Sequence, residues 1–303
     1  MTASDAPLFT ISIPTYNRAD GYLRETLQSA VAQRYQDMEI LVSDNCSTDH
    51  TAEVVASFSD PRLRYVKHEK NLGHEGNFNF CIEGARGAYV LVLHDDDLID
   101  PDFIETCARH MSGRTDYAML RTGVRVIDAE GRTLEEHVNH SRGDSGVDGF
   151  LQDLFQGAPL YMCHSVYHRQ RLLEVGGFTS PKRLYHDLVA VVRLVATGPR
   201  LEMADIKASF RRHGESRGTV SKMADWVEDA CYLVGVIAEV TKNNRELVEQ
   251  AKQYFCKKMY WYAVRVVASP LARFKVYRYI SKRFDHCYPY YRFIWLRWRS
   301  MFR

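Results

Sequence analysis

The sequence predicts an α/β fold, in which a doubly wound, mostly parallel β-sheet is followed by a helical C-terminal extension. Three observations lead to this prediction. Apolar, β-branched runs alternate with helical patterns over the first hundred residues, which is the order that builds parallel sheets. The run Ala88–Leu93 contains no charged residue, as expected of a strand that is covered on both faces. Beyond about residue 216 only helical periodicity remains.

The individual elements follow from composition and periodicity in chain order. The segments with the composition of strands are 8–14, 39–43, 63–67, 88–93, 116–127, 160–168 and 201–210. Helical patterns are found from Asp20, over 49–58 and 75–85, after Pro101, and over 226–240 and 247–267. Residues 128–148 are polar without a period, which predicts a long loop. We therefore expect a sheet-containing part, 1–215, and a helical part, 216–303.

The bulk properties are those of a globular protein, with 46% hydrophobic residues and a net charge of +2. The seven cysteines are scattered and form no CxxC pair, so we expect reduced thiols in a cytoplasmic protein rather than disulfides or a zinc site. The first residues lack the basic and apolar regions of a signal peptide. No apolar run approaches the ~20 residues of a spanning helix.

Three consecutive carboxylates, Asp95, Asp96 and Asp97, follow the strand 88–93. The carboxyl ends of strands are where ligands bind in open α/β sheets. Three adjacent carboxylates repel one another unless a cation shares them, and oxygen ligands favour Mg²⁺ or Mn²⁺. We expect Asp100 to cap the next helix, with Pro101 as its first residue. The alternative is a solvated acidic loop that only caps this helix.

The first strand ends in Pro14, Thr15, Tyr16, Asn17 and Arg18. No glycine occurs before position 21, which excludes the GxGxxG turn of dinucleotide-binding folds. The turn offers an aromatic ring, a hydroxyl and an amide, which suit a nucleobase and a ribose. A plain strand-to-helix turn is the alternative.

Asp44 ends the second strand. Its carboxylate could accept the N3–H of a uracil or thymine. Ser47 and Thr48, which come next, are explained equally well as caps of the following helix.

Four motifs in this order resemble family 2 glycosyltransferases with the GT-A fold. They are ISIPTYNR, ILVSDNCSTD, the KNLG of residues 70–73, and ARGAYVLVLHDDDLIDPD. The resemblance is close over residues 8–112, weaker to about 215, and absent beyond. It implies a GT-A nucleotide-sugar-binding and catalytic domain over 1–215.

The resemblance also implies roles for individual residues. The nucleotide would be bound by Pro14, Thr15, Tyr16, Asn17, Arg18, Asp44, Asn71, Asp95 and Arg211. The metal, Mn²⁺ or Mg²⁺, would be held by Asp96, Asp97 and His213. His94 stands where the family has its first aspartate, which leaves open whether Asp95 or Asp97 is the second important carboxylate. His94 itself is either a ligand or ribose contact or a packed strand-end histidine.

The general base implied by the resemblance is Asp187. It follows the Gly176-Gly177-Phe178 turn, after which the family often has an acidic pair at a helix start. Here the pair is His186-Asp187, so only the second acid matches. Without the resemblance, Asp187 reads as an ordinary first-turn aspartate favoured by the helix dipole.

The implied function is metal-dependent, inverting transfer of a hexose-type sugar from a UDP- or dTDP-sugar to a hydroxyl acceptor. A glycan or lipid-linked glycan of cell-surface polysaccharide synthesis is the expected acceptor. Two alternatives stay open: another metal-dependent phosphoryl-transfer enzyme, and a non-catalytic protein that binds nucleotide sugars.

The C-terminal tail, 271–303, contains nine Lys or Arg, one Asp and eleven aromatic residues. This composition favours an anionic membrane surface. We expect peripheral binding to the cytoplasmic face of a membrane, and no nucleic-acid partner. A packed C-terminal helix with snorkelling cations is the alternative.

Overall fold

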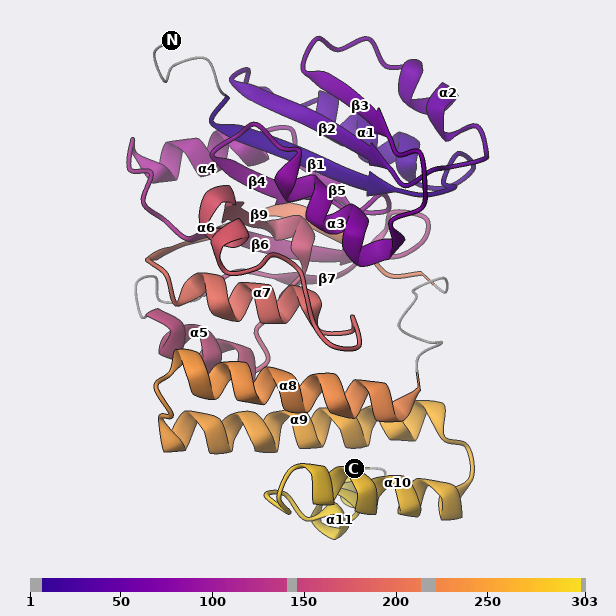
Figure 1. Ribbon diagram of the computed structural model, residues 1–303, viewed down its shortest axis with the longest axis vertical. Helices are drawn as coiled ribbons and strands as arrows, with labels where there is room; N and C mark the ends of the chain where they lie inside the picture. The colour runs from indigo at the N-terminus through magenta and orange to yellow at the C-terminus, as the bar shows by residue number, and fades with distance from the viewer. Residues whose placement is uncertain (1–6, 141–145, 214–221, 301–303) are drawn as a thin grey trace. The chain divides into compact units, whose positions relative to one another are not determined.

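The computed structural model describes residues 7–140, 146–213 and 222–300, and it contains two compact units (Figure 1). Unit 1 consists of Met1–Phe178 and Arg193–Gly214. Unit 2 consists of Thr179–Val192 and Glu215–Arg303. The segment Thr179–Val192, which contains Asp187, therefore groups with the C-terminal helices, whereas the sequence predicts a single division after residue 215.

Unit 1 is built on a nine-stranded sheet with the order β3-β2-β1-β4-β8-β6-β9-β5, and β7 pairs with β6. The strands are β1 Phe9–Thr15, β2 Met38–Asp44, β3 Leu63–Lys67, β4 Tyr89–Val92, β5 Leu98–Ile99, β6 Met119–Ile127, β7 Thr133–His137, β8 Ser165–His168 and β9 Arg200–Arg211. The first four strands run parallel, and β8 runs antiparallel to β4. The predicted α/β fold with a helical C-terminal part is confirmed.

The helices of unit 1 cover this sheet. They are α1 Leu23–Val31, α2 Thr51–Ala56, α3 Gly73–Glu83, α4 Phe103–Met111, α5 Gly146–Phe155, the 3-10 helix η1 Met162–His164 and α6 Arg169–Glu174. Residues Leu23 and Leu27 of α1, one turn apart, pack against Phe9 and Ile11 of β1 in the core. Burial of these apolar side chains is the main stabilising contribution to such a core.

The register of the parallel strands brings their carboxyl ends together. Thr15, the last residue of β1, lies opposite Asp44, the last residue of β2. On the other side of β1, Ser12 lies opposite Val92, where β4 ends. The polar residues that follow the three strands therefore meet at one edge of the sheet.

Two local expectations are wrong. Asp100 does not cap α4; it directly follows β5, which pairs with β9, and its backbone N–H donates to the Lys207 carbonyl. The N-cap position is Asp102, and the Asp100 carboxylate pairs with Arg125. The predicted loop 128–148 contains β7, which forms a hairpin with β6. Residues 141–145 of it lie outside the described part.

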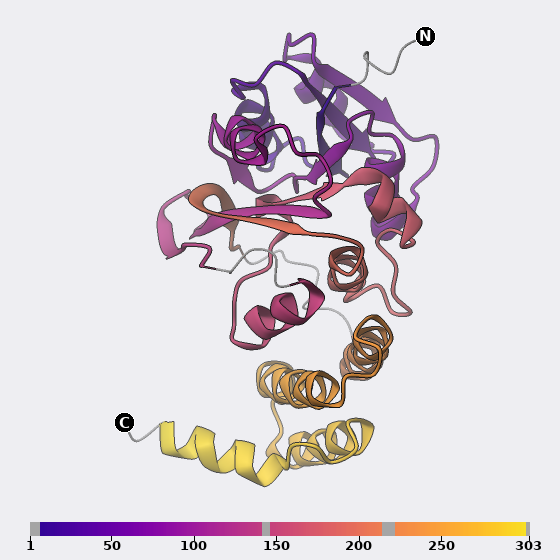
Figure 2. The same cartoon turned by 90° about the vertical axis from the view of Figure 1, so that its left-hand side faces the viewer.

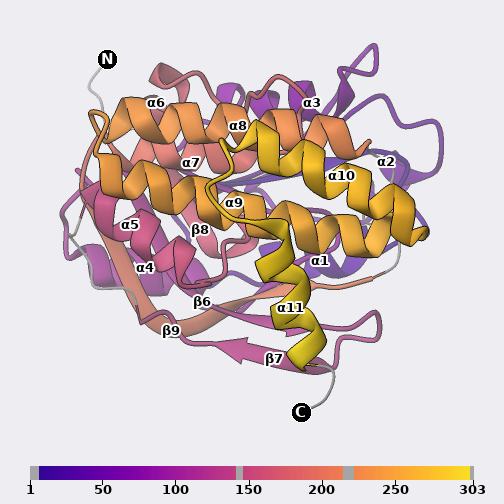
Figure 3. The same ribbon diagram turned by 90° about the horizontal axis from the view of Figure 1, so that it is seen from below.

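Unit 2 is helical. Its helices are α8 Met223–Val240, α9 Arg245–Val266, α10 Pro270–Arg283 and α11 Tyr290–Ser300, and α7 His186–Val195 begins in it. Figures 1 and 2 show α8 and α9 side by side. The Asn244 side chain caps α9, and Ser269 caps α10. Figure 3 shows α10 lying along α9.

Aromatic side chains of α11 pack against α10 and α9, and one of these contacts joins Tyr290 to Phe274. Phe293 is 4% exposed and packs against Tyr260, Trp261 and Tyr277. In the described part of the chain, no helix is both long and apolar enough to cross a membrane. All seven cysteines are free thiols.

Candidate functional site

The turns that follow β1 and β2 are linked by hydrogen bonds. The Asn17 backbone N–H donates to Ser47 Oγ (2.9 Å), and Asn17 Oδ1 accepts from the Thr48 N–H (2.8 Å). Asn17 has a φ of 52°, a left-handed conformation that asparagine tolerates better than most residues. Pro14 and Thr15 are buried, whereas Tyr16 and Arg18 are half-buried. The two turns therefore form a single polar rim in which Tyr16 and Arg18 remain accessible.

Asp44 lies under this rim and has no exposed surface. Its Oδ1 accepts the Ser47 N–H (2.8 Å), and its Oδ2 accepts the Tyr65 hydroxyl in a short hydrogen bond. Burial and the Asp44 charge raise the pKa of Tyr65, so this phenol stays protonated. Contact between Asp44 and a nucleobase requires Tyr65 to move from Oδ2. The sequence pattern identified Asp44 but not Tyr65.

Asn71 is exposed and is fixed beside the rim by Asn45. Asn45 Nδ2 donates to Asn71 Oδ1 (2.9 Å), and Asn45 Oδ1 accepts the Leu72 N–H (2.7 Å). The Gly73 N–H also donates to Asn71 Oδ1. The NLG turn thus lies next to the end of β2, as a nucleotide-binding role requires.

The residues after β4 form a cluster that could hold a metal ion. One ligand atom each from His94, Asp96 and Asp97 lies within 4.8 Å of the others. Asp97 is 1% exposed; its Oδ1 accepts the Arg211 N–H (2.9 Å), whereas Oδ2 is buried and accepts no N–H or O–H hydrogen bond from the described residues. A buried carboxylate oxygen without such a donor is costly unless a cation binds it. The donor set therefore fits a divalent cation.

Electrostatics at this cluster also favour a cation. Burial, and then the negative charges of Asp96 and Asp95, raise the pKa of the Asp97 carboxyl. Asp96 and Asp95 are half-buried. Arg18 Nε lies 3.9 Å from Asp95 Oδ1, which links the acidic cluster to the turn after β1. A divalent ion would relieve the repulsion between these carboxylates.

His213, which the resemblance implies as a metal ligand, lies beside Asp96 of this cluster. Its Nε2 is 2.9 Å from Asp96 Oδ2, and its side chain is 8% exposed. His94 Nδ1 lies 4.0 Å from Asp97 Oδ2, so His94 belongs to the cluster rather than to the apolar packing alone.

The expected contact of Arg211 with the nucleotide is corrected by the structure. Arg211 is 2% exposed, and its guanidinium is used inside the protein. It donates to the Asp96 carbonyl (2.9 Å), to the Ala129 carbonyl (3.0 Å) and to Glu25 Oε2 (2.6 Å). Arg211 therefore positions the aspartates. The sequence shows that an arginine precedes His213 by two positions, but not which way it points.

Asp187 is the second residue of α7, in unit 2, and its Oδ1 accepts the Leu188 N–H (2.7 Å). The segment before it is organised by Asp229 of α8, a buried carboxylate that sequence reasoning missed. Asp229 accepts hydrogen bonds of 2.6–2.9 Å from Ser180 Oγ and from the N–H groups of Lys182, Leu184 and Tyr185. No sequence signal identifies this role, because three of the four donors are backbone groups.

Lys258 of α9 is a cation whose pKa is affected by the charge of Asp187. Its ammonium lies 5.7 Å from the centre of the Tyr185 ring. Burial lowers the pKa of Lys258, while the charge of Asp187 opposes that shift. Asp187 is thus a half-buried carboxylate in the first turn of a helix. Asp229 holds the segment that leads into this helix, and the charge of Asp187 acts on a nearby lysine.

Comparison with known proteins agrees with this arrangement. The profile of the family described as "Glycosyl transferase family 2" matches residues 10–172. The succinoglycan biosynthesis protein ExoO of Rhizobium meliloti is 37% identical over 131 residues, which are 42% of this chain and 36% of that protein. The chain spans about half or less of the length of the curated relatives it matches.

Solved structures share the fold. The structure of S. aureus TarS 1–349 in complex with UDP-GlcNAc has a TM-score of 0.61 at 16% identity and covers 92% of this chain and 91% of its own. The mannosyltransferase PcManGT from Pyrobaculum calidifontis, in complex with GDP-Man and Mn²⁺, has a TM-score of 0.53 at 18% identity. The match covers 94% of this chain and 86% of PcManGT. At these identities the likeness is one of fold, and the fold is that of GT-A glycosyltransferases.

Proposed function

Because the chain belongs to glycosyl transferase family 2, we propose that it transfers a sugar from a UDP- or dTDP-sugar to a hydroxyl acceptor, with inversion and with a divalent metal. The observation that carries this proposal is the convergence at one sheet edge of the polar rim, Asn71 and the acidic cluster. A base site and a cation site side by side suit a nucleoside diphosphate.

The proposed nucleotide site is the rim formed after β1 and β2. Tyr16 offers a ring face for a base, and Asp44 an acceptor for the N3–H of uracil or thymine once Tyr65 moves. Pro14, Thr15, Asn17 and Arg18 would complete this site, with Asn71 at its side. TarS, with the same fold, binds UDP-GlcNAc in its crystal structure, so this fold can accommodate a pyrimidine donor.

The proposed metal, Mn²⁺ or Mg²⁺, would be held by Asp96 and Asp97, with His94 and His213 beside them. When bound, such an ion neutralises the charge that develops on the leaving diphosphate. The Mn²⁺ in PcManGT supports this role. Asp95 would face the nucleotide together with Arg18, and Arg211 would hold Asp96 and Asp97 in place.

In this proposal Asp187 is the general base. It would take the proton of the acceptor hydroxyl as that oxygen attacks the anomeric carbon. Attack from the side opposite the leaving group gives inversion. Asp229 acts on this step only by holding the segment that leads to Asp187.

The proposed acceptor is a glycan or a lipid-linked glycan in cell-surface polysaccharide synthesis. ExoO, a succinoglycan biosynthesis protein, supports this class.

For the tail, we propose peripheral binding to the cytoplasmic face of an anionic membrane. Tyr291, Trp295 and Trp298 of α11 are 68%, 53% and 61% exposed, next to arginines 292, 297 and 299. Exposed aromatic rings among cations suit a membrane interface.

Product analysis separates this function from its alternatives. Incubation with a UDP-sugar should give UDP and a glycoside, or UDP and free sugar when water replaces the acceptor. A phosphoryl-transfer enzyme would release orthophosphate or a sugar phosphate. A binding protein would retain the UDP-sugar without converting it.

A further inference from the structure

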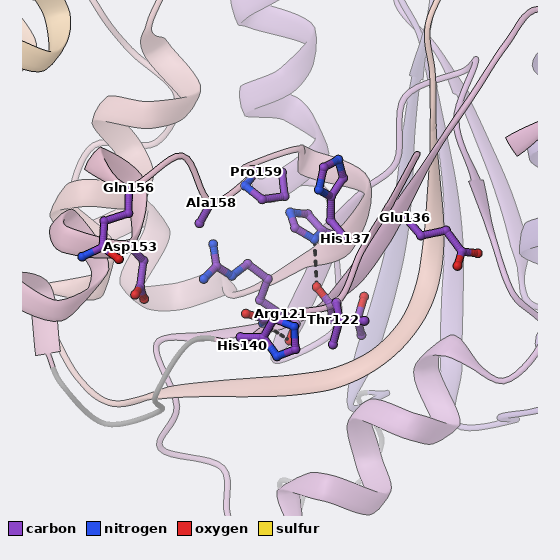
Figure 4. Close-up of a pocket in the computed structure, with 12 residues that line it drawn as sticks. Arg121, Thr122, Glu136, His137, His140, Asp153, Gln156, Ala158 and Pro159 are labelled. Atoms are coloured by element: carbon purple, nitrogen blue, oxygen red, sulfur yellow. Dashed lines mark hydrogen bonds between the residues drawn. The ribbon is translucent and has the colours of Figure 1, made fainter. Parts of the chain in front are cut away.

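A cavity of unit 1 lies outside the proposed nucleotide and metal sites. It has a volume of about 460 Å³, within the range of roughly 300–1,000 Å³ typical of small-molecule pockets. Figure 4 shows its lining, which comes from three parts of the chain. Prominent among the lining residues are Arg121 and Thr122 of β6, His137 and His140 at and after the end of β7, and Asp153 and Gln156 in and directly after the last turn of α5.

The charged side chains that line the cavity, or lie directly behind its lining, are paired with one another. Arg121 Nε lies 2.8 Å from Glu202 Oε2, and Arg200 Nη1 lies 2.8 Å from Glu202 Oε1. Asp153 lies 3.9 Å from Arg200. The side chains of Arg200 and Glu202 are 0% exposed. An anion entering here would have to break a buried pair, which is costly, and it would also face Asp153.

His164 contributes an uncharged ring to the lining of the cavity. Its Nδ1 donates to the Thr122 carbonyl (2.8 Å), and its Nε2 accepts the Tyr161 N–H (3.1 Å). Burial lowers its pKa to about 3, so this ring is uncharged at neutral pH. In Figure 4 the carboxylate of Glu136 points away from Arg121 and Asp153. The lining is therefore polar, and within the described residues its arginine, Arg121, and the Arg200 behind it are both paired with Glu202.

The polar groups of the cavity suit a ligand with many hydroxyl groups. The Asp153 carboxylate accepts hydrogen bonds, whereas the Gln156 amide both donates and accepts them. His137 and His140 add ring nitrogens that can act in either sense. Sugar hydroxyls donate and accept in the same way, and they carry no charge.

The helix η1 connects this cavity to the acidic cluster. The Cys163 thiol lies beside the Asp97 carboxylate, and the next residue, His164, lines the cavity. The two sites therefore share η1 as a wall. An acceptor chain that reaches the acidic cluster could pass through this cavity.

We propose that this cavity binds an uncharged sugar unit of the acceptor glycan, through Asp153, Gln156 and the two histidines His137 and His140. This inference rests on the proposed glycosyltransferase function and names the chemical class of its acceptor: neutral sugar units rather than uronic acids or phosphorylated sugars at this position.

The test is binding of simple glycosides to the full chain, measured by saturation-transfer NMR. The probes are methyl glucoside, methyl galactoside and methyl N-acetylglucosaminide, with glucuronate as the charged comparison. At least one neutral glycoside should bind, and glucuronate should bind more weakly. Gln156→Ala and Asp153→Asn should each raise the dissociation constant about five-fold or more, as expected for one lost hydrogen bond. Gln152→Ala, one turn earlier and exposed on α5, is the matched control and should leave it unchanged.

Three results would overturn the inference: no binding of any neutral glycoside, glucuronate binding at least as tightly, or unchanged affinity in both cavity variants. Urea unfolding of each variant establishes that it is folded. Release of nucleoside diphosphate from a UDP- or dTDP-sugar, measured on the same samples, separates this failure from failure of the proposed function. If the cavity assignment alone is wrong, the native chain still releases UDP or dTDP; if the glycosyltransferase proposal is wrong, it converts neither donor, whatever the glycosides do.

Discussion

His213 Nε2 lies 2.9 Å from Asp96 Oδ2, although 117 positions separate the two residues in the sequence. The pairing of β5 with β9 explains this contact. Leu98 lies opposite Ser209 in that antiparallel pair, so the residues before Leu98 run alongside those after Ser209. The Arg211 N–H, which donates to Asp97 Oδ1 at 2.9 Å, fixes the same alignment. A two-residue strand thus joins both halves of the proposed metal site.

Replacement of His213 should weaken the binding of the metal ion. Groups that ligate or orient a metal ligand typically contribute 10–100-fold in metal affinity or activity. His213→Ala should therefore raise the Mn²⁺ concentration for half-maximal UDP-sugar hydrolysis about tenfold or more. His110→Ala, which changes an exposed histidine beside Asp205, is the control. If His213→Ala needs the same Mn²⁺ concentration for half-maximal hydrolysis as the native chain, the contact of His213 with Asp96 is purely structural.

Replacement of Asp187 by asparagine keeps the shape of the side chain and removes its basicity. Turnover with acceptor should fall ~10²-fold or more, while UDP affinity, measured by calorimetry, stays near that of the native chain. Asp148→Asn removes another first-turn helix aspartate, at the start of α5, and should change little. Turnover close to native in Asp187→Asn would assign the base to a different residue.

Asp229 should stabilise unit 2 more than a typical surface carboxylate does. Asp229→Ala leaves three buried or partly buried N–H groups without their acceptor, and we expect a loss of about 2–4 kcal/mol in the free energy of unfolding. Urea denaturation measures this loss. Asp225→Asn, one turn earlier in α8, changes a carboxylate that is 36% exposed and should cost less than about 0.5 kcal/mol. Equal effects of the two substitutions would argue against a bracing role.

The tail should bind anionic vesicles through the exposed face of α11. The double variant Trp295→Ser/Trp298→Ser leaves the Phe293 contact intact and should reduce cosedimentation with phosphatidylserine vesicles at low salt. Leu134→Ser, which changes a side chain of β7 that is 51% exposed, serves as the control. Binding of the native chain should decrease as salt rises, since each cation near such a surface contributes about 1 kcal/mol of screenable attraction. If the native chain does not cosediment at low salt, α11 is a packed structural helix.

Short local patterns account for what the sequence predicted well. The strands up to residue 92 and the position of the aspartate triplet follow from apolar runs that end in polar residues. Relationships between distant segments were not predictable in this way. The pairing of β5 with β9, the burial of Arg211 and the hydrogen bonds of Asp229 depend on which segments meet in space. The N-cap at Asp100 failed for the same reason, because its carboxylate pairs with Arg125 of β6.

The central claim, a metal-dependent transferase with a pyrimidine nucleotide-sugar donor, is tested most directly by measuring nucleoside diphosphate release from UDP-, dTDP- and GDP-sugars. Each donor is supplied with Mn²⁺ or Mg²⁺ and, in parallel, with excess EDTA. We predict that UDP or dTDP is released fastest, that EDTA abolishes the release, and that Asp96→Ala abolishes it without unfolding the chain. Faster release of GDP, or full release in EDTA, would contradict the account.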